Sequence, residues 1–95
     1  NSEAARIFKA FCDEKRLDIL TQLGEEELCA MRLCEKLNIG QSTLSHHMKI
    51  LCDSGMVDVR REGTFVYYSI SETGGRQIKS VLDAIMKVKG YQEGK

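Results

Sequence analysis

The stretch QSTLSHHMKILCDSGMVDVRREGTFVYYSI, residues 41–70, decides the fold. Its first half divides into two helical faces, because apolar and polar side chains each recur at positions i, i+3, i+4 and i+7. The apolar face consists of Leu44, His47, Met48 and Leu51. The polar face, which has short side chains and a positive charge, consists of Ser42, Ser45, His46 and Lys49. The pattern predicts a helix with one buried and one exposed face, ended by Gly55.

A β-hairpin is predicted directly after this helix. The segments VDVRR at 57–61 and TFVYYSI at 64–70 are rich in β-branched and aromatic residues, which favour strands. Glu62 and Gly63 join them in the manner of a tight turn. The helix and hairpin together indicate a helical domain that carries a small wing.

Three further helices are predicted before residue 41. The first is striped by Ala4, Ile7, Phe8 and Phe11. The second begins after a capping Asp13 and ends at Gly24. The third carries an apolar stripe of Ala30, Leu33, Cys34 and Leu37. Residues 38–40 then interrupt the pattern, so the third and fourth helices are separated by a short turn.

The last predicted element is a closing helix that begins after Thr73, Gly74 and Gly75. Its apolar stripe consists of Ile78, Val81, Leu82 and Ile85. The predicted order is ααααββα, a mainly α fold with a small β-hairpin (α+β), that is, a winged helix-turn-helix. A chain of 95 residues suits a single domain, which we expect to span residues 1–95.

A short helix, a tight turn and a helix of about a dozen residues have the geometry that lets the second helix enter a major groove about 12 Å wide. The side chains expected to meet base edges and phosphates are Gln41, Ser42, Thr43, Ser45, His46 and Lys49 on the helix, with Arg60, Arg61 and Thr64 on the wing. If three cations per protomer each neutralise a phosphate, log affinity against log salt slopes by about −5. His47 shares the apolar face, so we expect it to be buried and hydrogen-bonded.

Composition sets the class of protein. Fourteen basic and fourteen acidic residues cancel, which argues against nonspecific coating of nucleic acid through bulk charge. The sequence has no apolar run near the ~20 residues of a membrane span and no secretory pattern, so a cytoplasmic protein with no membrane partner is predicted. Its four cysteines are accordingly expected to be reduced thiols.

Residues 41–70 resemble the recognition helix and wing of the ArsR/SmtB repressors, and FKAFCDEKRLDIL at 8–20 resembles the start of that family's second helix. With ELCAMRLCEKL at 27–37, the likeness covers roughly residues 4–71. It implies a homodimeric repressor that binds operator DNA and is released by a metal, a metalloid or another signal. Two-fold symmetry further implies an inverted-repeat operator.

The resemblance also implies a dimer interface made by the first and last helices. Both helices carry apolar stripes, which agrees with that implication. The residues expected in the interface are Ile7, Phe8, Phe11, Val81, Leu82 and Ile85.

The family's inducer-binding motif is matched only in part by this sequence. Arsenic-responsive members of the family carry ELCxCxxC at the third helix, and this chain reads ELCAMRLC at 27–34, with Met31 at the central position. Arsenite, antimonite or a soft metal ion at Cys29 and Cys34 is therefore one expectation, although a thioether is a poor substitute for a thiolate. Packing of Cys34 in the core and thiol oxidation are the alternatives. The family's other metal site is expected to be absent, because residues 76–95 contain Asp83 but no histidine.

Two other classes of function compete with a DNA-binding regulator. An enzyme is not expected, since the sequence shows neither a nucleophile with a positioned base nor a set of ligands for a catalytic metal. A winged-helix module that binds a protein partner remains the alternative, because the neutral net charge would suit it.

Overall fold

The computed structural model describes residues 2–87; residue 1 and residues 88–95, which complete the predicted domain span, lie outside the described residues. The elements in chain order are α1 (Ser2–Phe11), α2 (Glu14–Leu23), β1 (Leu28–Cys29), α3 (Ala30–Leu37), α4 (Gln41–Asp53), β2 (Val57–Glu62), β3 (Phe65–Ile70) and α5 (Glu72–Ile85). The predicted order of five helices and a hairpin is confirmed. The two-residue strand β1 is an addition that the sequence analysis missed.

Helix α2 begins and ends where the sequence predicts. The Asp13 carboxylate accepts a hydrogen bond from the Arg16 backbone N–H at 3.1 Å, so it caps α2 as expected. This hydrogen bond, together with the nearby Arg16 charge, lowers the pKa of Asp13. Gly24 is the C-cap of α2.

A three-residue turn, residues 38–40, separates α3 from α4. Asn38 adopts the left-handed conformation at φ 55°, which ends α3 sharply. The Ile39 N–H then donates to the Cys34 carbonyl at 3.1 Å, closing the helix end. The short turn fixes α4 against α3, which is the helix-turn-helix arrangement.

The sheet has three antiparallel strands in the order β1-β3-β2. Gly63 and Thr64 form the two-residue turn of the wing, one position later than the predicted turn at Glu62 and Gly63. Of these two turn residues only Gly63 has a positive φ, 61°, as in a type II′ turn, where glycine occupies the first central position. The register pairs Arg60 with Tyr67 and Arg61 with Val66.

Helix α5 begins earlier than the sequence analysis predicted. Ser71 is its N-cap, and the Ser71 hydroxyl accepts a hydrogen bond from the Gly74 N–H at 3.0 Å. The prediction that the helix starts after Gly74 and Gly75 is therefore wrong, since both glycines lie inside α5.

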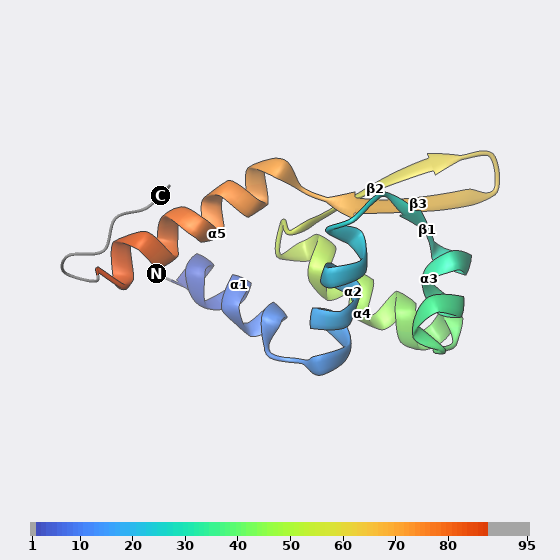
Figure 1. Cartoon of the computed structure of the whole chain (residues 1–95), viewed down its shortest axis with the longest axis horizontal. Helices are drawn as coiled ribbons and strands as arrows, with labels where there is room; N and C mark the ends of the chain where they lie inside the picture. Colours follow the sequence, from blue (N-terminus) through green and yellow to red (C-terminus); the bar gives the residue numbers. More distant parts are fainter. Residues whose placement is uncertain (1, 88–95) are drawn as a thin grey trace.

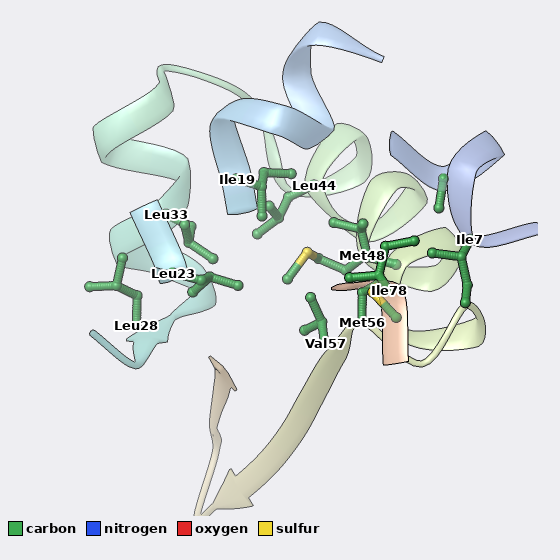
Figure 2. Packing of buried hydrophobic residues seen from close by; sticks show 12 residues of the cluster. Ile7, Ile19, Leu23, Leu28, Leu33, Leu44, Met48, Met56, Val57 and Ile78 are labelled. Atoms are coloured by element: carbon green, nitrogen blue, oxygen red, sulfur yellow. The ribbon is translucent and has the colours of Figure 1, made fainter. Parts of the chain in front are cut away.

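Buried side chains from all five helices and from β1 and β2 form one hydrophobic cluster (Figure 2). Ile19, Leu33 and Leu51 are fully buried within it. Ile7 also lies in this cluster with 2% of its surface exposed, so its predicted place in a dimer interface is corrected: it packs within its own chain. The apolar face of α4 is buried as predicted.

The wing and the paired terminal helices lie at opposite ends of the molecule (Figure 1). The hairpin of β2 and β3 projects beyond α3, whereas α1 and α5 run beside each other away from it. No helix among residues 2–87 is long and apolar enough to cross a lipid bilayer.

Candidate nucleic-acid interface

The polar face of α4 is open to solvent. The exposed residues on it are Gln41, Ser42, Thr43, Ser45, His46 and Lys49. The fold can expose them because the opposite face of the same helix is anchored in the core. In addition, the N-cap residue of α4 is Gly40, which has no side chain to accept hydrogen bonds from the first-turn N–H groups. These N–H groups therefore have no capping side chain as a partner.

Arg61 lies on the side of the sheet that faces this surface. It lines a cavity of about 260 Å³ together with Gln41 and Ser45, and a second of about 200 Å³ with Ser45 and Lys49. Helix α4 and strand β2 therefore present their polar groups as one continuous surface. Hydroxyl and amide groups there can meet base edges, while the guanidinium supplies a charge for a phosphate.

Arg60 points to the opposite side of the sheet, because neighbouring residues of a strand alternate. Its guanidinium donates to both carboxylate oxygens of Glu27, at 3.1 and 2.9 Å, and to Glu62 at 2.9 Å. It also stacks 4.5 Å from the centre of the Tyr67 ring. These hydrogen bonds raise the pKa of Arg60 and lower that of Glu27. The structure thus separates Arg60 from the surface that holds Arg61.

Lys49 and Thr64 stand at two margins of the surface. The Lys49 ammonium pairs with Asp53 at 3.2 Å, but both side chains are largely exposed, so the pair is weak and a phosphate can compete for the lysine. Thr64 is exposed in the wing turn and lines a cavity of about 360 Å³ with Gln41 and Cys29. Thr64 and the start of α4 therefore border the same hollow, while the hairpin itself projects past α3 (Figure 1).

His47 is buried, as predicted, with 8% of its surface exposed. The Arg16 guanidinium lies 3.2 Å from His47 Nδ1 and also donates to the Ala10 carbonyl at 2.6 Å. Because arginine only donates, Nδ1 must accept, and the imidazole is neutral with its proton on Nε2. Burial lowers the pKa of His47, and the nearby Arg16 acts in the same direction against the opposing effect of Asp13. This junction joins α1, α2 and α4.

The lowered pKa predicts a loss of stability in mild acid. The unfolded chain takes up a proton near pH 6.5, whereas folded His47 does so only at lower pH. Its contribution is complete above pH 6.5 and falls below it, by at most about 1.4 kcal/mol per pH unit. Urea unfolding at pH 7.5 and 5.5 should show a larger acid loss for the wild type than for His47→Gln. The exposed-site control His46→Gln should behave as the wild type; an equal acid loss in all three proteins would contradict this role.

The cysteines do not assemble a complete soft-metal site. Cys29 lies in β1 and is the N-cap of α3, whereas Cys34 is half-buried against the core and Met31 is exposed. Among residues 2–87, no group of three or more histidine, cysteine, aspartate or glutamate side chains could hold a metal ion. All four cysteines are free, and burial raises the pKa of Cys52, which disfavours its thiolate. The residues present therefore do not fit a metal or metalloid ion that is coordinated by three cysteine thiolates.

The other predicted interface residues lie on α1 and α5. Phe8, Phe11 and Val81 are half-buried against the chain's own fold. Leu82 and Ile85 expose 42% and 58% of their surfaces, and Met86, which the sequence analysis missed, exposes 63%. Three neighbouring apolar side chains at the end of α5 are thus left without cover within the described chain.

Comparison with known proteins places these features in a family. Residues 13–59 match the bacterial regulatory protein, arsR family. A transcriptional regulator of the HTH type from Methanocaldococcus jannaschii is 39% identical over 84 residues, covering 87% of this chain and 94% of that protein. The arsenical resistance operon repressor of Staphylococcus xylosus is 40% identical over 83 residues, covering 87% and 80%.

A solved structure shows the same fold. It is the homodimeric winged helix-turn-helix DNA-binding domain (fragment 1–100) of a possible ArsR-family transcriptional regulator from Mycobacterium bovis, determined in solution. It matches with a TM-score of 0.75 and 27% identity, over 96% of this chain and 89% of that one. The chain therefore belongs to the ArsR family and is a winged helix-turn-helix transcriptional regulator rather than an enzyme.

Proposed function

We propose that this regulator is a cytoplasmic repressor that binds an inverted-repeat operator in double-stranded DNA as a homodimer. The observation that carries the proposal is the open polar face of α4, which is continuous with Arg61 of the wing. A helix that buries one face completely and presents amide, hydroxyl and imidazole groups on the other is suited to a major groove.

Different parts of this surface have different roles in the proposal. Gln41, Ser45 and His46 contact base edges and so carry the sequence preference. Ser42 and Thr43, in the first turn of α4, bind phosphate together with the backbone N–H groups there. On the wing side, Lys49, Arg61 and Thr64 hold the DNA backbone.

Arg60 lies outside this surface and has a structural role in the proposal. It fixes the wing, because its guanidinium is already bonded to Glu27 and Glu62.

The homodimer forms through α1 and α5. Leu82, Ile85 and Met86 supply exposed apolar surface there, and Phe8 and Phe11 supply half-buried aromatic rings on the neighbouring helix. The relative from Mycobacterium bovis is homodimeric, which supports self-association of this chain. Two copies related by a two-fold axis present two α4 helices, which is why the operator should be an inverted repeat.

The proposal is tested with DNA from upstream of the protein's own gene, using fluorescence anisotropy. Replacing Ser45 and His46 together by alanine should weaken specific binding by about 2 kcal/mol or more, roughly thirtyfold, while binding to scrambled DNA hardly changes. Lys15→Ala, an exposed basic site on α2, is the matched control and should leave specific binding intact. Equal affinity of the wild type for operator and scrambled duplex would refute sequence-specific binding.

The dimer and the direction of regulation are tested separately. Sedimentation should give a dimer for the wild type and a monomer for the double variant Leu82→Glu, Ile85→Glu, because buried charges oppose association. In vitro transcription from the operator should fall when the protein is added. A monomeric wild type would contradict the two-fold symmetric dimer and with it the reason for an inverted-repeat operator. Increased transcription would show that the protein is an activator.

A further inference from the structure

A cavity of about 370 Å³ is lined by residues of α1, the start of α2 and the end of α4. These parts of the three helices lie away from the tip of the wing (Figure 1). Its lining residues are Arg6, Lys9, Ala10, Arg16, Ile50, Asp53 and Ser54. None of them belongs to the proposed DNA surface or to the proposed dimer contact. The volume is within the range of sites that hold small organic ligands.

The charge around this cavity is strongly unbalanced for a chain whose total charge is zero. Three lining residues are cations, and Asp53 is the only acid among them. The Asp53 carboxylate is paired with Lys49 at 3.2 Å on the outer side of α4, so part of its charge is already compensated. Arg16 is likewise paired with the Asp13 carboxylate at 4.0 Å, so the positive charge that residues 2–87 leave without an ion-pair partner comes from Arg6 and Lys9.

The three cations differ in how firmly they are held. Arg16 is held in place by hydrogen bonds to the Ala10 carbonyl and to His47 and by its ion pair with Asp13. Arg6 uses Nη2 to donate to the Asp53 carbonyl at 2.9 Å, which leaves its remaining N–H groups available. The Lys9 ammonium makes no hydrogen bond or ion pair with any residue in 2–87, whereas the Lys9 backbone carbonyl is engaged, accepting from the Cys12 N–H at 3.1 Å. Arg6 and Lys9 are thus the two cations that can turn toward a ligand.

The rest of the lining is apolar or small. Ala10 is buried, with 2% of its surface exposed, and Ile50 is half-buried against the core. An inorganic anion would satisfy the cations but would leave this apolar floor uncovered. A molecule with a carboxylate at one end and an apolar body at the other would satisfy both.

We propose that this cavity binds a small amphipathic carboxylate. Its carboxylate pairs with Arg6 and Lys9, and its apolar body lies on Ala10 and Ile50. The two cations supply orientation, and the floor favours an aromatic or aliphatic body over a fully hydrated anion.

The site also connects the two functional parts of the molecule, a step that rests on the proposed function. Helix α1 belongs to the proposed dimer contact, and α4 is the proposed DNA helix. Arg6 joins them, because its guanidinium bonds the carbonyl of the last residue of α4. A ligand that draws Arg6 into the cavity acts on that bond and can bias the position of α4.

Binding is tested without DNA, on the full chain, by NMR titration with 2-naphthoate. The neutral isostere 2-naphthamide and inorganic phosphate are titrated in parallel. Saturable shifts of the Ala10 and Ile50 amides are expected with naphthoate, at an affinity about tenfold higher than with either comparison ligand. If the amide-bearing isostere binds as well as naphthoate, the cations have no role; if phosphate does, the apolar floor has none. Either result, or no saturable shift at all, overturns the proposal.

Charge variants locate the site. Lys9→Gln should weaken naphthoate binding by a factor of about five, and adding Arg6→Gln should weaken it further. Lys15→Gln removes a positive charge from α2 outside the cavity and should leave the affinity unchanged. Equal weakening by Lys9→Gln and Lys15→Gln would show a general charge effect and contradict the assigned site.

A second assay measures operator affinity with and without naphthoate. A change of threefold or more that Lys9→Gln abolishes would establish coupling. If naphthoate binds but operator affinity is constant, the coupling is wrong and the site stands. If no operator is bound at all, the proposed function fails while the titration still decides the cavity.

Discussion

Replacing Gly74 by alanine is expected to destabilise the fold by about 2–3 kcal/mol, although alanine is the better helix former. A Cβ at this position would collide with the carbonyl oxygen of Gly55 and press on the end of the Met56 side chain. The backbone carbonyl cannot rotate away as a flexible side chain can. Helix α5 would have to move off the loop that follows α4, which would also disturb Ile78 in the core.

The neighbouring glycine provides the control. Gly75 also lies within α5, but a Cβ there would meet nothing within 4 Å, and its φ is not in the left-handed region. Gly75→Ala should therefore leave stability unchanged or raise it by up to about 1 kcal/mol. Urea unfolding of both variants at one fixed protein concentration measures the difference, since dimerisation also contributes to stability. Equal stability of the two variants would show that α5 does not pack on Gly55.

The role of Gly74 could not be predicted from the sequence. Two adjacent glycines are a reasonable sign of a helix boundary, and the sequence analysis used them so. The reason for Gly74 is a contact with Gly55, nineteen positions earlier, which no local pattern reveals. The start of α5 at Ser71 could have been predicted, because serine is a preferred N-cap residue.

The helical faces, in contrast, could be predicted because they depend on period alone. Leu44, His47 and Met48 are buried and Ser45 is exposed, as the 3.6-residue repeat requires. The same repeat placed Ile7 on the stripe of α1. It could not tell whether such a stripe packs within the chain or against a partner, because both bury apolar surface equally well.

The orientation of the two wing arginines was predictable from the sequence, but the partner of Arg60 was not. Strand alternation alone implies that Arg60 and Arg61 point to opposite sides, so the sequence held a clue that the joint assignment of both to DNA did not use. The partner that holds Arg60 could not be predicted, because Glu27 lies 33 residues away and meets it through the pairing of β1 with β3. A two-residue strand such as β1 has too little pattern to detect.

The two arginines should differ sharply in a DNA-binding experiment. Arg61→Ala removes a guanidinium that bonds to no side chain among residues 2–87 from the surface beside Ser45 and Lys49, and it does so twice in a dimer. At about 1 kcal/mol for each phosphate contact, operator affinity should fall roughly thirtyfold. Arg60→Ala breaks exposed ion pairs with Glu27 and Glu62 instead, so affinity should change by less than about threefold.

Salt dependence separates a lost phosphate contact from a displaced wing. With Lys49 and Arg61 in both protomers as the phosphate-binding cations, log affinity against log salt should slope by about −3.6, less steeply than the −5 expected if Arg60 also took part. Arg61→Ala should reduce the slope by about 1.8, whereas Arg60→Ala should leave it unchanged. A displaced wing would lower affinity at every salt concentration without this selective change. If Arg60→Ala reduces the slope as much as Arg61→Ala does, the bonds to Glu27 and Glu62 must open when DNA binds, and both arginines contact phosphate.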